Sequence, residues 1–172
     1  MMRSRWLLAA AAGGAMLASA TAAQAQLSPL GMMIRGGVFM PSSGAGGAIG
    51  DQWIAVGAEM DIFRPGFGFI PIPLDPKFTL SVDAYNKSGV SSVPVLFNLR
   101  VRQGGLRFSG GVGVAFADIP DEDSTIEFAY QVSAGYDLPW FGLPLTAELR
   151  WFGVQGVGTT LDGFAITIGF RL

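Results

Sequence analysis

The 172-residue chain contains neither cysteine nor histidine. Without cysteine it can form no disulfide scaffold and no thiolate metal site. Without histidine it can form no Ser-His-Asp triad, no histidine-based zinc site and no imidazole proton shuttle. The sequence predicts no catalytic residues, no metal site and no cofactor.

Charged residues are also scarce, at 14% of the chain, with 11 basic against 13 acidic side chains. This balance leaves no basic patch for a nucleic-acid partner. Half of the residues are hydrophobic, which is too many for a disordered chain. The length fits one folded domain.

The first 25 residues have the pattern of a secretory signal peptide. Arg3 and Arg5 precede an apolar run from Trp6 to Ala18 that is too short to span a membrane as a helix. The small residues Ala23 and Ala25 flank Gln24, so cleavage is expected between Ala25 and Gln26. The predicted mature domain is therefore 26–172.

No long apolar run follows, but hydrophobic and polar residues alternate through most of the mature chain. In 77–85, for example, Phe78, Leu80 and Val82 oppose Thr79 and Ser81. Such period-two alternation predicts β-strands. The expected strands are 31–40, 53–62, 77–85, 93–102, 106–116, 126–138, 143–152 and 163–172. The proline-containing segment 63–76 is expected to be a long apolar connection rather than a strand.

Eight strands of this length predict a transmembrane barrel. A tilted strand needs about 9–11 residues to cross a bilayer, and bacterial outer-membrane barrels have an even number of strands. We therefore expect an all-β, eight-stranded antiparallel up-and-down barrel in the outer membrane of a Gram-negative bacterium. With the N-terminus in the periplasm, segments 41–52, 86–92, 117–125 and 153–162 would face outside.

The residue types predict which face of each strand points to lipid. One face carries large aliphatic and aromatic side chains, and the other carries small residues and charges. A narrow lumen suits opposite charges that pair. The predicted lumen charge network is Arg35, Glu59, Asp61, Lys77, Asp83, Arg100, Arg102, Arg107, Glu127, Asp137, Glu148, Arg150 and Arg171.

Two alternatives to a closed membrane barrel stay open at this point. The lumen charges could line a narrow porin-like channel for small solutes. The opposite arrangement of faces would give a soluble, lipocalin-like periplasmic binder of apolar ligands, which also has eight strands. The scarcity of lysine, with only Lys77 and Lys87, argues against a soluble surface.

Four stretches, 93–102, 110–116, 148–151 and 166–172, resemble the small outer-membrane β-barrel proteins of the OmpA/OmpX type. The resemblance implies a monomer that contacts outer-membrane lipid and lipopolysaccharide, with an envelope-structural or surface-interaction role. It also implies a C-terminal strand that the barrel-insertion machinery reads. The residues in the matching positions are Phe164, Ile166, Ile168, Phe170 and Leu172. Ending on leucine departs from the aromatic residue usual in that family.

Three kinds of chemical site are possible on such a barrel, and the sequence argues against each. Some similar barrels act on lipid A with a histidine and a serine, and this chain lacks the histidine. Lys77 and Ser81 share a face, but four strand residues separate them by about 13 Å, too far for proton transfer. The acidic cluster at Asp118 and 121–123 lacks the spacing of a calcium loop. We therefore predict a non-enzymatic protein.

Overall fold

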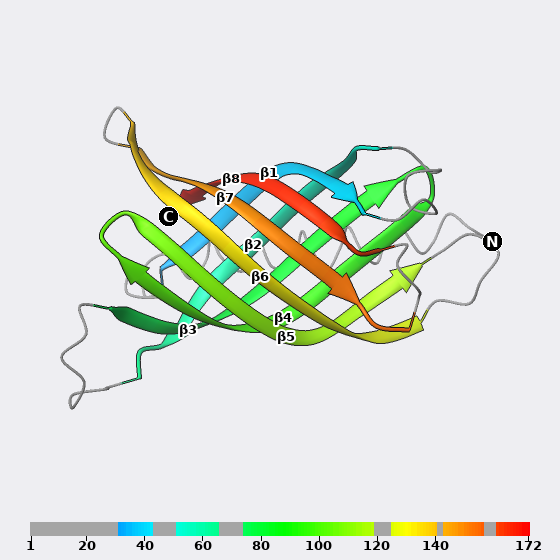
Figure 1. Ribbon diagram of the computed structural model, residues 1–172, viewed down its shortest axis with the longest axis horizontal. Helices are drawn as coiled ribbons and strands as arrows, with labels where there is room; N and C mark the ends of the chain where they lie inside the picture. Colours follow the sequence, from blue (N-terminus) through cyan, green and yellow to red (C-terminus); the bar gives the residue numbers. More distant parts are fainter. Residues whose placement is uncertain (1–30, 43–50, 66–73, 119–124, 141–142, 157–160) are drawn as a thin grey trace. The chain divides into compact units, whose positions relative to one another are not determined.

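A computed structural model describes residues 31–42, 51–65, 74–118, 125–140, 143–156 and 161–172. The predicted signal peptide and its cleavage site between Ala25 and Gln26 lie outside these ranges. Eight strands form within them, and each is hydrogen-bonded to the next in antiparallel order (Figure 1). Their bounds are β1 (Met32–Pro41), β2 (Trp53–Phe63), β3 (Asp75–Lys87), β4 (Val90–Gln103), β5 (Leu106–Asp118), β6 (Thr125–Trp140), β7 (Leu143–Val154) and β8 (Gly163–Arg171).

Pairing of β1 with β8 closes the sheet into a barrel. The seam is tight at Gly37, where a Cβ atom would overlap the backbone of Ile166 and Thr167 on β8. Closure gives every strand two partners, so no unpaired sheet edge remains among these eight strands. The predicted fold class is confirmed. In the described ranges, no helix is long and apolar enough to span a membrane.

The strands follow the predicted ranges closely and extend past several of them. The clearest case is β3–β4, where pairing continues to Lys87 and Val90 across Ser88 and Gly89. Both turn residues have positive φ, at 49° and 91°. Two successive positive φ values are typical of the type I′ turn, which matches the twist of hairpin strands. Of the connection predicted for 63–76, β2 takes Phe63 and β3 takes Asp75 and Pro76, while 66–73 lies outside the described residues.

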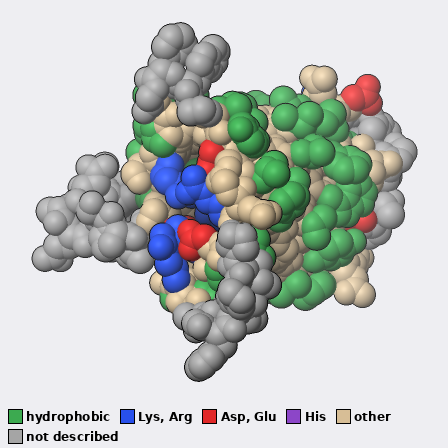
Figure 2. Space-filling model, turned by 60° about the vertical axis from the view of Figure 1, so that its left-hand side comes forward, with side chains coloured by type: hydrophobic (Ala, Val, Ile, Leu, Met, Phe, Trp, Pro, Cys, Tyr) green, Lys and Arg blue, Asp and Glu red, His purple; other side chains and the backbone are tan. Residues whose placement is uncertain are grey.

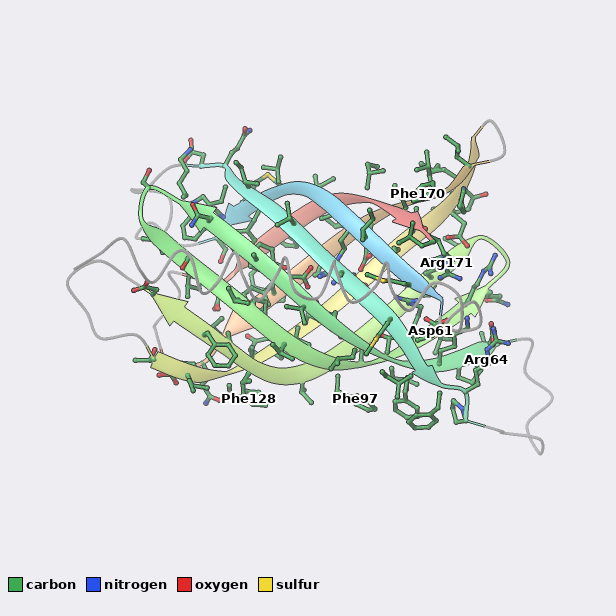
Figure 3. The ribbon with its side chains drawn as sticks, turned by 180° about the vertical axis from the view of Figure 1, so that it is seen from behind. Asp61, Arg64, Phe97, Phe128, Phe170 and Arg171 are labelled. Atoms are coloured by element: carbon green, nitrogen blue, oxygen red, sulfur yellow. The ribbon has the colours of Figure 1, made fainter. Side chains whose placement is uncertain are left out.

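The large apolar side chains point outward. Val112 and Ile166, from the middle of their strands, are 54% and 53% exposed. Hydrophobic side chains cover the barrel wall in Figure 2, and Phe97 and Phe128 point away from the barrel in Figure 3. The predicted faces are therefore right. The lipocalin-like alternative needed this apolar set inside, and the structure contradicts it.

One end of the interior differs from the polar lumen that the sequence predicted. Phe39, Trp53, Tyr85 and Phe152 point inward and are buried together. The ring centroid of Phe39 lies 5.5 Å from that of Trp53 and 4.7 Å from that of Tyr85, and Tyr85 lies 5.0 Å from Phe152. Offset and edge-on rings at these separations attract each other. We call these four residues the aromatic cluster. It fills the end of the lumen where β1 and β3 finish and β2 begins, which we call the loop end.

If the exposed apolar wall faces lipid, the cost of placing a charge on it should depend on depth in the bilayer. Ile168→Arg, on the outer face in the middle of β8, should lower the free energy of unfolding in lipid vesicles by ~2–4 kcal/mol. The matched change Ile54→Arg lies at the rim, beside Trp53, and should cost only about 0–1 kcal/mol. Urea titration of the refolded variants measures both. Equal costs at the two depths would contradict a lipid-facing wall.

Candidate functional site: the barrel interior

The middle of the lumen holds a connected network of charged side chains. Its members come from β1, β2, β3, β4 and β7, and each is an inward position of its strand. Four are basic and four are acidic, so the network is neutral. We call it the ionic network: Arg35, Glu59, Asp61, Lys77, Asp83, Arg100, Glu148 and Arg150.

Arg35 lies at the centre of the ionic network. Its Nε and Nη2 donate to the two carboxylate oxygens of Asp83 at 2.8 and 2.7 Å. Its Nη1 donates to Glu59 at 2.6 Å. This paired contact of a guanidinium with a carboxylate is the strongest common form of charged hydrogen bond. The Arg35 side chain is fully buried, so these acceptors replace water.

Two further groups extend the network from this centre. On one side, Arg150 donates to Asp83 at 2.7 Å and to Glu148 at 3.0 Å.

On the other side, Arg100 contacts both Glu59 and Asp61, and Lys77 donates to Asp61 at 2.7 Å. Every carboxylate of the network therefore faces at least one cation. Buried charges need such compensation, because an unpaired one is costly inside a protein.

Neutral polar side chains fill the lumen beside the charges. Asn98 donates to Ser81 at 3.1 Å and accepts from Gln131, and the hydroxyls of Ser109 and Ser133 lie 2.7 Å apart. The cavity next to Arg100 has a volume of about 10 Å³, roughly the space of one water molecule. The interior at this level is therefore filled by side chains.

The thirteen charges predicted for the lumen do not all join one network. Arg102 and Arg107 form a separate group with Asp137 at the end opposite the aromatic cluster, and the Arg102 side chain is 44% exposed. Glu127 and Arg171 form no ion pair with any other residue of the described ranges, so they belong to neither group. Glu127 lies at the aromatic end, where its register partner is Ala115, and Arg171 lies at the other end of the barrel.

The sequence pattern missed the neutral members of the lumen as contributors. Asn98 and Gln131 occupy inward positions of their strands, as alternation predicts, but the predicted lumen network contained charged residues only. Their hydrogen bond joins β4 to β6, which are not neighbours in the sheet. The pattern along one strand carries no information on such contacts across the lumen.

The inward position of Lys77 and Ser81 is as expected, and each has another partner. Lys77 donates to Asp61, and the Ser81 hydroxyl accepts from Asn98. The described ranges contain no group of three or more acidic side chains placed to hold a metal ion. Residues 121–123 lie outside those ranges.

Comparisons with known proteins give structural neighbours only. No family model matches the chain, and no curated protein matches it. Among solved structures, it is similar to the outer membrane enzyme PagL, with 11% identity over 81% of this chain and 99% of that one, at a TM-score of 0.50. The chain has the fold of a small outer-membrane β-barrel of the OmpA/OmpX type.

A second solved structure is the outer membrane protein Ail of Yersinia pestis in a phospholipid bilayer nanodisc. It shares 9% identity over 83% of this chain and 99% of that one, at a TM-score of 0.49. Both neighbours are described as outer-membrane proteins, and the likeness of this chain to them is one of fold. PagL is an enzyme, so the barrel fold alone decides neither for nor against catalysis.

Removing the central cation of the ionic network should strongly lower the stability of the barrel. Arg35→Met leaves Glu59 and Asp83 without this partner and should cost ~3–5 kcal/mol of unfolding free energy. The control Arg64→Met removes an exposed pair, with Asp75 at 4.0 Å, and should cost at most about 1 kcal/mol. Urea unfolding in detergent micelles compares the two. A cost for Arg35→Met no larger than that of the control would contradict the role assigned to the network.

Proposed function

We propose that this protein is a closed, non-conducting outer-membrane barrel with an envelope-structural or surface-interaction role. The observation that carries the proposal is the filled interior. The aromatic cluster occupies the loop end of the lumen, and the ionic network occupies the middle. An apolar wall outside and neutral, paired charges inside suit a rigid scaffold in a bilayer.

The narrow-channel alternative has less support. A conducting lumen needs a continuous water-filled path, and eight strands enclose only enough space for side chains. Here Trp53, Phe39 and Phe152 are each at most 1% exposed, so they pack against one another rather than line a pore. The carboxylates and guanidinium groups bind each other at 2.6–3.0 Å around Arg35 and Arg150, which leaves them poorly available to a passing ion.

A non-enzymatic role is part of the proposal. The chain has no histidine, and the inward Ser81 has Asn98 rather than a base within hydrogen-bond distance. General-base catalysis needs a proton acceptor in direct reach of the nucleophile. The ionic network uses its carboxylates as acceptors for arginine and lysine, a structural use of these groups.

We propose outer-membrane lipid and lipopolysaccharide as the partners of the apolar wall, and the barrel-insertion machinery as the partner of β8. The residues predicted for this signal alternate on the outer face of the last strand. Of them, Phe164, Ile166 and Ile168 are 44%, 53% and 49% exposed. We propose a monomer, because the closed sheet offers no free strand edge to a second copy.

The conductance of the purified protein tests the closed lumen. Refolded protein in planar lipid bilayers is expected to give no single-channel steps, since its interior is filled by side chains. The same preparation must show heat-modifiable gel migration, which verifies that the barrel is folded. Single-channel current steps whose frequency scales with the amount of folded protein would contradict the proposal and support the channel alternative.

Single cysteines test the orientation, because the natural chain has none. Gln52 and Gln103 are both exposed, at opposite ends of the barrel. In intact Gram-negative cells, a membrane-impermeant maleimide should label Gln52→Cys, and should label Gln103→Cys only after the outer membrane is permeabilised. The reverse pattern would invert the orientation, and labelling of neither site would argue against insertion.

A further inference from the structure

The end of the barrel opposite the aromatic cluster carries an excess of arginine. Here the β6–β7 hairpin extends past its neighbours, since β5 pairs with β6 only as far as Tyr136 and β8 pairs with β7 only as far as Leu145 (Figure 1). A hollow of about 440 Å³ lies at the base of this extension. Its charged lining residues are Arg102, Arg107, Arg171 and Asp137. Figure 2 shows charged side chains gathered in this end of the barrel.

The two arginines of the β4–β5 hairpin share one carboxylate. Arg102 and Arg107 are direct cross-strand partners, a position in which like charges repel. Asp137 lies 3.1 Å from Arg102 and 2.5 Å from Arg107, and it also accepts from Thr146 at 2.9 Å. This single acid therefore compensates one positive charge of the pair.

The third arginine adds a charge without a counterion. Arg171, from β8, forms no ion pair within the described part of the chain, and its buried Nε has no hydrogen-bond partner there. The buried Nε of Arg107 is likewise without a partner, and its Nη1 meets only the weak acceptor Met33 Sδ at 3.8 Å. Among the side chains that line the hollow, three guanidinium groups face one carboxylate, which leaves an excess of about two positive charges and several unused donors.

We propose that Arg102, Arg107 and Arg171 form a binding site for a phosphate group. Guanidinium groups donate in pairs to phosphate oxygens, and a negatively charged phosphate would offset the excess positive charge of this hollow. The ionic network is a poor anion site, because its positive charges are already balanced by its own carboxylates. The site lies at the end of the interior, beyond the ionic network and the aromatic cluster that fill the lumen, so the proposed function and this site can fail independently.

The phosphate could belong to a free anion or to a lipid headgroup. Leu138, Leu143 and Leu145 line the same hollow beside the arginines. A headgroup at the membrane boundary would place its phosphate on the arginines and its apolar part along these leucines, whereas inorganic pyrophosphate would use the arginines alone. Both sources share one chemistry, and two measurements separate them.

Calorimetric titration measures the free anion. Full-length mature protein, refolded in a non-ionic detergent, is titrated with inorganic pyrophosphate. Arg107→Gln and Arg171→Gln should each weaken binding by at least about tenfold, since each removes charged hydrogen bonds. The control Arg64→Gln lies at the same end of the barrel (Figure 3), is 67% exposed and should stay within about twofold of the wild type.

Native mass spectrometry measures the lipid. Protein refolded in nanodiscs of phosphatidylcholine and phosphatidylglycerol in equal amounts is released and weighed with its retained lipid. Wild type and Arg64→Gln should retain phosphatidylglycerol, and Arg171→Gln should lose it. Arg171 has no ion pair within the described ranges to lose, so this variant should fold, as heat-modifiable migration verifies.

Arginine-dependent binding of pyrophosphate supports the site with a free anion as ligand. Arginine-dependent retention of phosphatidylglycerol without pyrophosphate binding supports it with a lipid headgroup. Binding of neither probe, or binding that the folded Arg107 and Arg171 variants leave unchanged, overturns the proposal.

Discussion

The structure depends on charge neutralisation in a space that lipid surrounds. The outer wall of the barrel is apolar, so the inward side chains cannot be exchanged for outward ones without placing charges against hydrocarbon. Charges inside the lumen are tolerated only when opposite charges meet them. The four cations and four anions of the ionic network satisfy this condition through contacts between strands that lie far apart in the sequence, such as Arg35 with Asp83.

The interior is organised along the barrel axis in three parts. Aromatic rings fill the loop end, the neutral ionic network fills the middle, and the arginine-rich hollow lies at the opposite end. Each part has a different chemical character. The aromatic rings pack against one another and the charges of the ionic network pair with one another. The hollow, in contrast, contains arginine donors that have no hydrogen-bond partner in the described chain. These unused donors distinguish that end as the proposed ligand site.

The fold is kept at very low sequence identity because few of its structural requirements demand one particular amino acid at one position. The likeness to PagL holds at 11% identity over nearly the whole length of that protein. A membrane barrel needs alternation, strands of sufficient length, and closure that satisfies every backbone group. Many sequences meet these conditions, so the fold is shared while the lumen and loops are free to differ. The features that bear on function are therefore the interior and the two ends of this barrel.

The sequence by itself determined the eight strands, their lengths and their outward faces, because these follow from local alternation along each strand. In β4, for example, Val95 and Phe97 point outward and Asn98 and Arg100 inward, as the pattern predicts. Only the tertiary structure decided which inward residues meet. Alternation does not give the register between strands or the contacts across the lumen, and these place Phe39 against Tyr85, join Arg35 to Asp83 and leave Arg171 without an ion pair in the described chain.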